Sequence, residues 1–419
     1  MTTKRQDERG SHLVKSIKRS DFRQGVWHVK SESQPNVEYR VLYESAACAC
    51  TCAAFRLHQP EWCKHIWAVH EFVSENTDMA PIGPTPAPVG RYRDWAEYHK
   101  SRAWQIEQVE TLMAELCRPL TTPIASPKGG RPRNPVADVV YTLVLRAYCN
   151  FPGRRFPRLL SSILEHALTK GAITRVPGAS SAQSCLGEGW MESLLTELIL
   201  STSFPFRSLE TIIAVDCSGF LGSRRQNYTK RKTGGKGRER GWKRAHIMCG
   251  VRTGIITAAI VTDAHDHDSP LLPPLLEMTC QRFKVKEVLG DSAYASARNF
   301  EAILAKGAKP YINFRKNAKG AKPGAWRETF LYYRDHHAEW QEHYRRRRMV
   351  EAVWSATKRM FGERLRSKGD VAAQNELLLK LLCYNLCCLI RCIHEFGIEP
   401  EFTNGSMNGQ NGWRIQRPE

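Results

Sequence analysis

The sequence has no continuous apolar run of about 18 residues, and it opens on the polar and basic residues Met1 to Gln6. A helix that crosses a bilayer needs roughly 20 apolar residues, and a secretory signal needs an apolar segment near its start. We therefore predict no membrane-spanning segment and no membrane partner. The 14 cysteines are then expected to be reduced thiols in a cytoplasmic protein rather than disulfides.

Acidic residues are scarce relative to basic ones. The chain has 62 Lys and Arg against 42 Asp and Glu, which gives a formal net charge of +20. Such an excess favours an anionic polymer as the partner. A nucleotide P-loop is missing, because the Gly-Gly-Lys-Gly run at 234–237 lacks the GxxxxGK[ST] spacing. With 419 residues, the chain is long enough for two or three domains.

Two aspartates follow predicted strands. Residues 211–215 are apolar and mostly β-branched, and the run stops at Asp216. Residues 285–289 form a second such run, and Asp291 comes shortly after it. Acids at strand ends of an α/β sheet point into the crevice where ligands bind, and Mg²⁺ prefers oxygen ligands. Both aspartates are therefore candidate metal ligands.

A third acid lies on a predicted helix. Residues 344–358 contain neither Gly nor Pro and are rich in helix formers. At 100° per residue, four side chains fall within roughly 60° of one another on this helix. They are a phenol, a guanidinium, a carboxylate and an ammonium, from Tyr344, Arg347, Glu351 and Lys358. This face is suited to handling phosphates around one acid, which would complete a metal site with the two aspartates.

The two aspartates and the helix face that carries Glu351 follow one another along the chain as the catalytic motifs do in DDE transposases of bacterial and archaeal insertion sequences, which the chain therefore resembles. The shared features include Tyr294 shortly after the second aspartate and the Y-(2)-R-(3)-E-(6)-K spacing that starts at Tyr344. The likeness spans about residues 130 to 396. It also takes in Trp242-Lys243, His246, residues 250–253 and residues 268–270.

The resemblance implies an α/β, ribonuclease H-like catalytic domain, in which helices flank a mixed sheet. Two Mg²⁺ or Mn²⁺ ions on Asp216, Asp291 and Glu351 would activate water or a DNA 3′-hydroxyl and stabilise the leaving oxygen. The implied activity is metal-dependent cleavage of DNA at the element ends, followed by transfer of the 3′-OH into target DNA. The implied partners are double-stranded DNA, as terminal inverted repeats and target, and further copies of the chain in a homodimer or larger assembly. The location would be the cytoplasm, in association with the nucleoid.

Five residues are expected to support catalysis by holding DNA. Arg347 and Lys358 can bind phosphates, and the guanidinium can do so with two hydrogen bonds. Tyr344 can pack on a sugar or a displaced base. Lys243 and His246 belong to the resembling region and are expected to contact phosphates.

A cysteine cluster near the start of the chain predicts a zinc site. Ten residues separate Cys50 and Cys52 from Cys63 and His65, and the four side chains are a suitable set for a tetrahedral, structural Zn²⁺. The alternative is a group of reduced cysteines in a small core, and Cys48 could replace one of the first two ligands. The pattern resembles a SWIM-type zinc finger, CxC…CxH. That resemblance favours Cys50 and Cys52, because the residues after them match the family's pattern.

Composition divides the chain into parts. Residues 77–90 contain four prolines and two glycines, which is typical of a linker. Residues 224–244 contain ten basic residues against one acid and are expected to grip phosphates. The predicted parts are a zinc-binding α+β module (1–76), the linker (77–90), a helical, DNA-binding domain (91–205), the catalytic domain (206–370), a C-terminal packing helix (371–400) and a disordered tail (401–419).

The run from His265 to Asp268 alternates imidazoles and carboxylates and could be mistaken for a transition-metal site. Because neighbours in a short loop point apart, we expect Asp268 to shape the active-site loop instead.

Two other functions are compatible with the sequence. One is a DNA-binding regulator derived from a transposase, which the presence of all three acids argues against. The other is a general nuclease with the same fold. Dependence of cleavage on terminal inverted repeats would exclude it.

Overall fold

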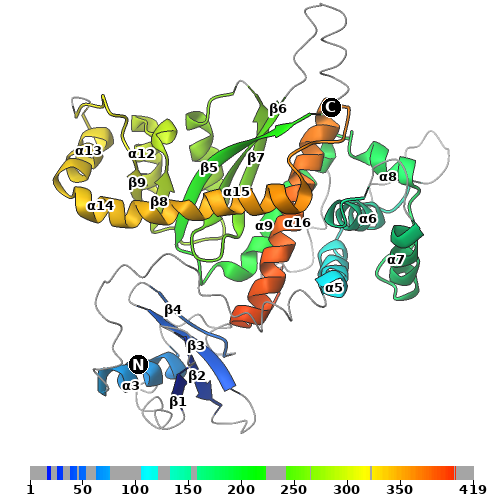
Figure 1. Cartoon of the computed structure of the whole chain (residues 1–419), viewed down its shortest axis with the longest axis horizontal. Coiled ribbons are helices and arrows are strands. Elements are labelled where there is room, and N and C mark those ends of the chain that lie inside the picture. The colour runs from blue at the N-terminus through cyan, green and yellow to red at the C-terminus, as the bar shows by residue number, and fades with distance from the viewer. Residues whose placement is uncertain are drawn as a thin grey trace, which may run out of the picture. The chain divides into compact units, whose positions relative to one another are not determined.

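The structure is a computed structural model of the chain (Figure 1). It divides into two compact units, residues 1–103 with 391–399, and residues 104–390 with 400–419. The predicted linker, residues 223–241 of the basic segment, His265 and the tail beyond residue 402 lie outside the described residues. The structure describes residues 17–19, 26–31, 38–44, 47–52, 63–75, 105–120, 133–151, 158–222, 242–264, 266–320, 323–400 and 402.

The first unit contains an antiparallel sheet and a helix. The strand order is β1-β2-β3-β4. Alternating apolar residues predicted the two central strands, since Trp27 and Val29 of β2 and Val41 of β3 are buried. The helix packs Ile66 and Val69 inward. The bounds are β1 Ile17–Arg19, β2 Val26–Lys30, β3 Glu38–Glu44, β4 Ala47–Cys50 and α3 Lys64–Glu75.

The second unit begins with a helical region. A buried carboxylate fixes its connections, because Asp138 accepts hydrogen bonds from Thr174 N, Thr174 Oγ1 and Arg175 N at 2.8–3.0 Å. The helices are α5 Gln105–Cys117, α6 Val136–Tyr148, α7 Arg158–Thr169, α8 Ala179–Cys185 and α9 Trp190–Ser203.

A five-stranded mixed sheet follows, in the order β7-β6-β5-β8-β9. Strands β5, β6 and β7 are antiparallel neighbours, whereas β8 and β9 join β5 in parallel. The predicted α/β architecture with a mixed sheet flanked by helices is therefore confirmed. The bounds are β5 Ile212–Leu221, β6 Trp242–Gly250, β7 Ile256–Asp263, β8 Glu287–Gly290 and β9 Lys309–Ile312.

Helices cover this sheet. In Figure 1, α14 and α15 run across one face of the sheet, and their contacts are with β8 and β9 and with β5 and β6, respectively. The remaining helices after β7 are α11 Leu272–Cys280, α12 Ala297–Ala305, α13 Ala325–Asp335, α14 His337–Tyr344, α15 Arg348–Phe361 and α16 Asp370–Phe396, with the 3₁₀ turns η4 Ser269–Leu271, η5 Ser292–Tyr294 and η6 Arg345–Arg347.

Helix α16 packs against the edge of the sheet. Asn385 accepts a hydrogen bond from Ile256 N and donates one to Ile256 O, so its amide satisfies backbone groups of the edge strand β7. Among the described helices, α16 is long and apolar enough to cross a membrane, but its apolar window is 78% buried within the protein. A helix that is buried to this extent is typical of a protein core.

Two local predictions need correction. Asp216 does not end a strand, because β5 continues to Leu221 through its antiparallel pairing with β6. The segment 344–358 is not one regular helix, because a 3₁₀ turn, η6, lies between α14 and α15.

Candidate active site

Two aspartates lie side by side where the parallel pairing of β5 and β8 ends. The last paired residues are Ala214 and Leu289, so Asp216 and Asp291 each lie two positions beyond the same pair. Gly290 permits this approach, since a Cβ there would lie 3.0 Å from a side-chain methyl of β5. The two carboxylates therefore share one edge of the parallel part of the sheet, although Asp216 is inside a longer strand.

The third carboxylate comes from α15. The 3₁₀ turn has three residues per turn, so Tyr344 and Arg347 point to the same side, with the guanidinium carbon 5.8 Å from the tyrosine ring centre. Arg347 Nη2 donates to Glu351 Oε1 at 2.5 Å, and its Nη1 lies 3.7 Å from Asp216 Oδ1. One guanidinium thus links the acid on the helix to the acid on the strand.

The charges of the three acids interact. Burial raises the pKa of Asp216 from 3.8 to about 6. Arg347 opposes this change in pKa, whereas the negative charges of Asp291 and Glu351 add to it. The carboxylates are therefore close enough to destabilise one another's charge, and a cation among them would relieve the repulsion.

The donor set suits a hard divalent ion. All three side chains offer carboxylate oxygens, which Mg²⁺ prefers. Asp291 Oδ1 accepts a hydrogen bond from Ala293 N at 2.9 Å, which orients that carboxylate. The side chain of Glu351 is 55% exposed, so water and a phosphate can reach the site. These residues fit the predicted Mg²⁺ or Mn²⁺ site.

Lys358 lies farther along the same helix, over the strand that carries Asp216. Its Nζ is 5.2 Å from the centre of the Phe220 ring, and Lys380 Nζ is 6.0 Å from it. Lys380 is buried and donates to the carbonyl oxygens of Gly362 and Arg364. Lys358 is only half-buried. Of the two ammonium groups beside the Phe220 ring, that of Lys358 can therefore reach a phosphate.

The structure does not place Lys243 for a phosphate contact. The residue is buried, and its Nζ lies 2.6 Å from Asp263 Oδ1 and 2.9 Å from Asp370 Oδ1. An ammonium paired with two carboxylates holds β6, β7 and the start of α16 together. The predicted phosphate role is corrected, because two carboxylates already pair with this ammonium.

His246 is also not placed for a DNA contact. Its side chain is fully buried on β6, with Nε2 at 3.0 Å from Thr262 Oγ1. Burial lowers the pKa of His246 to about 4, so the ring is neutral at physiological pH. A neutral, inaccessible imidazole cannot hold a phosphate, which corrects the prediction.

Residues 250–253, which belong to the region that resembles DDE transposases, have a structural role in this fold. Glu210, which is buried, accepts hydrogen bonds from Thr253 N and Oγ1 and from Arg252 N. A Cβ at Gly250 would lie 2.1 Å from Glu210 Cδ, so glycine is required there. Sequence reasoning missed Glu210 because a single acid before a strand carries no pattern.

The four predicted zinc ligands come together in the first unit. The ligand atoms of Cys50, Cys52, Cys63 and His65 all lie within 4.8 Å of one another, and all four residues are buried. His65 Nε2 has no hydrogen-bond partner among the described residues. The pKa of Cys50 is raised well above its usual value by burial and by the two neighbouring thiols. A bound cation would offset this crowding, so the set fits Zn²⁺; the side chain of Cys48 lies outside the described residues.

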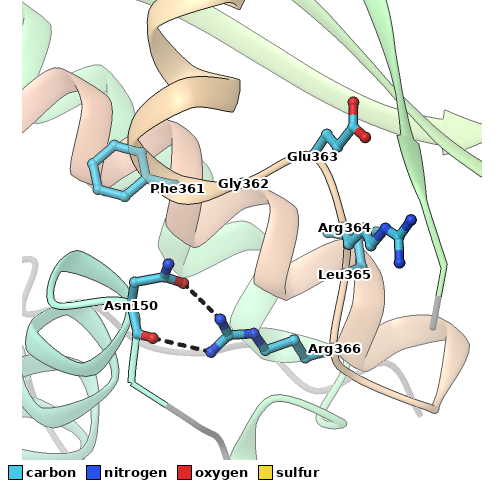
Figure 2. A pocket seen from close by; sticks show the side chains of 7 residues that line it. All are labelled: Asn150, Phe361, Gly362, Glu363, Arg364, Leu365 and Arg366. Carbon is cyan, nitrogen blue, oxygen red and sulfur yellow. Dashed lines mark hydrogen bonds between the residues drawn. The ribbon is translucent and has the colours of Figure 1, made fainter. Parts of the chain in front are cut away.

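A separate cleft of about 560 Å³ lies between the end of α6 and the segment after α15 (Figure 2). Asn150 and residues 361–366 line it, and Arg366 donates to Asn150 O, Asn150 Oδ1 and Phe151 O. Arg366 is held by these bonds, and none of the three carboxylates lines the cleft. We assign it a structural role in joining the helical region to the sheet domain.

Three carboxylates that meet beside a mixed sheet form a candidate carboxylate metal centre. Residues 207–386, less than half of the chain, match the family model described as the transposase DDE domain. The matched range contains the whole five-stranded sheet and the three acids.

Among solved structures, the chain is similar to a piggyBac transposase in a synaptic complex with hairpin DNA. The sequence identity is 10% and the TM-score is 0.34, with 71% of this chain and 74% of that chain covered. No curated protein matches the chain.

Proposed function

We propose that the protein is a transposase of the insertion-sequence type, which cleaves DNA at the ends of its element and joins the freed 3′-OH to target DNA. The observation that carries this proposal is the meeting of Asp216 and Asp291 at one sheet edge with Glu351 across from them, inside the range that matches a transposase DDE domain. A DNA-binding regulator that has lost catalysis, the alternative function, would not need this arrangement of acids.

Asp216, Asp291 and Glu351 would hold the Mg²⁺ or Mn²⁺ ions. When bound, the ions would activate the attacking oxygen and stabilise the leaving one. Arg347 would turn from the two acids toward a DNA phosphate once the ions neutralise them, and a guanidinium can bind a phosphate with two hydrogen bonds. Lys358 would hold a neighbouring phosphate.

The net charge of +20 supports double-stranded DNA as the partner, as terminal inverted repeats and as target. Joining two element ends would require a homodimer or a larger assembly. Cys50, Cys52, Cys63 and His65 would hold a structural Zn²⁺ in a SWIM-type module, because four protein ligands leave no open position for chemistry. The protein would act in the cytoplasm, at the nucleoid.

The test is cleavage of labelled DNA that carries the terminal inverted repeats, with Mg²⁺, Mn²⁺ or EDTA. Glu351→Gln is expected to abolish cleavage and to leave binding in a gel-shift assay within a few-fold, because it removes one negative metal ligand and little volume. Glu342→Gln, at an exposed position of α14, is the matched control and should cleave normally.

Other outcomes would decide between the functions. Tight binding by the wild type without cleavage in any metal would favour the regulator. Cleavage that does not depend on the repeats would favour the general nuclease. Loss of DNA binding in Glu351→Gln would mean that Glu351 has a structural role.

A further inference from the structure

A second group of metal-binding side chains lies beside the three carboxylates. Cys217 and His246 are opposite each other in the antiparallel pairing of β5 and β6. Asp268, directly before η4, lies against both. The ligand atoms of these three side chains all lie within 4.8 Å of one another. Asp268 therefore faces the sheet rather than its histidine neighbour in the loop.

Three buried polar atoms here, on His246, Asp268 and Tyr294, have no hydrogen-bond partner among the described residues, although Asp268 Oδ1 forms an ion pair with Arg244. His246 Nε2 lies 3.0 Å from Thr262 Oγ1 and 3.9 Å from Cys217 Sγ, whereas Nδ1 lies 3.6 Å from Asp268 Oδ1 and has no hydrogen-bond partner. Tyr294 Oη is also unpartnered, although the residue is only 1% exposed. Burial, together with the charges of Cys217, Asp268, Asp216 and Asp291, raises the pKa of this phenol. A buried polar atom without a partner costs folding free energy, so the occurrence of these atoms together points to a ligand.

The chemistry of the donors indicates which ligand. A thiolate, an imidazole and a carboxylate are the ligands of Zn²⁺, whereas Mg²⁺ prefers oxygen alone. If His246 Nε2 carries the proton, it donates to Thr262 Oγ1, and the lone pair of Nδ1 is free for a metal. Three protein ligands would leave a fourth position for water.

Arg244 is the cation that balances the group in the metal-free protein. Its Nε donates to Cys217 Sγ at 3.2 Å, and its Nη2 lies 2.6 Å from Asp268 Oδ1. The side chain is 27% exposed, and Nη1 also donates to Asp266 O at 2.8 Å. The guanidinium can therefore move outward and keep a partner while an ion replaces its charge. The thiol proton would pass to solvent as the thiolate binds.

We propose that Cys217, His246 and Asp268 form a binding site for Zn²⁺, separate from both the three carboxylates and the cysteine cluster of the first unit. Because Cys217 directly follows Asp216 on β5, an occupied site would fix the strand beside the carboxylate centre. The site is defined by its own donors, so it does not depend on the proposed transposase activity.

The test counts zinc in the full-length protein after loading with Zn²⁺ and desalting. The wild type is expected to hold two zinc ions per chain, one of them in the first unit. Cys217→Ser and Asp268→Asn are each expected to hold one. Cys280→Ser, at a half-buried cysteine on α11, is the matched control and should hold two. With Co²⁺ in place of Zn²⁺, the difference spectrum between wild type and Cys217→Ser should contain a thiolate-to-cobalt charge-transfer band.

Three results would overturn the proposal. One is a wild type that holds a single zinc, which Cys52→Ser removes; buried water would then occupy the group. Another is an unchanged zinc content in Cys217→Ser. The third is an equal loss of zinc in Cys280→Ser, which would indicate adventitious binding by thiols. Circular dichroism of each variant checks that the fold is retained.

Discussion

Asp216→Asn should make the metal-free protein more stable while it abolishes cleavage. Burial, with the charges of the other two acids, raises the pKa of Asp216 from 3.8 to about 6. Because the folded-state pKa lies above the unfolded value, ionisation of Asp216 costs stability. The cost is absent below about pH 3.8, grows between that pH and about 6, and is complete above.

The size of the pKa shift of Asp216 sets the expected change in the free energy of unfolding. At 1.36 kcal/mol for each pKa unit, the full cost is about 3 kcal/mol above pH 6 and roughly half of that at pH 5. Water that enters a partly exposed site reduces such a penalty, so we expect a gain of about 1–3 kcal/mol from the uncharged amide. For a domain of this size, each kcal/mol raises the Tm by about 2–4 °C.

The assay is thermal unfolding of the full chain in EDTA, at pH 7.5 and at pH 5. Asp216→Asn should melt several degrees above the wild type at the higher pH and show a smaller gain at the lower one. Saturating Mg²⁺ should reduce or reverse the difference, because only the wild type binds the ion well. The exposed Asp335, whose pKa is lowered by Arg334, provides the control, and Asp335→Asn should give no gain. A variant that melts at or below the wild type at pH 7.5 would refute the reasoning.

Two further variants test other contacts. Arg347→Ala should lower cleavage by about 100-fold, as loss of a donor to transition-state charge does, and should also destabilise the metal-free protein, because the partly buried carboxylate of Asp216 loses its nearby cation. Cleavage by the neighbouring exposed variant Arg348→Ala should fall only a few-fold, and equal losses would contradict the role of Arg347. Lys380→Met should lower the free energy of unfolding by about 2–4 kcal/mol, because two carbonyl oxygens lose a charged donor. Urea unfolding measures this change, and an unchanged midpoint, matching that of the exposed variant Lys368→Met, would contradict it.

Much of the architecture could be predicted from local pattern. The apolar runs before Asp216 and Asp291 correspond to β5 and β8, and the absence of Gly and Pro from 344 to 358 corresponds to a nearly continuous helical segment. The spacing of Cys50, Cys52, Cys63 and His65 predicted a cluster that the structure brings together. These features depend on neighbours in sequence, which the chain displays directly.

Pairing between distant segments decided the rest. Asp216 lies inside a strand because β6 continues the pairing after β8 has ended. Lys243 and His246 were predicted to contact phosphates, yet the fold buries both, one against two carboxylates and the other against Thr262. Burial and partners depend on which strands become neighbours, and no local pattern states that.

Residue types and their order along the chain were thus readable before folding, including the three acids and the clustered cysteines. The environments of these residues in the folded protein could not be read from the sequence. Cys217 and Asp268 are fifty-one positions apart in the numbering, and only the meeting of β5, β6 and the loop before η4 puts a thiol, an imidazole and a carboxylate within 4.8 Å. A site of this kind arises from long-range contacts, because the free energy that holds it together comes from packing of the whole sheet rather than from its own residues.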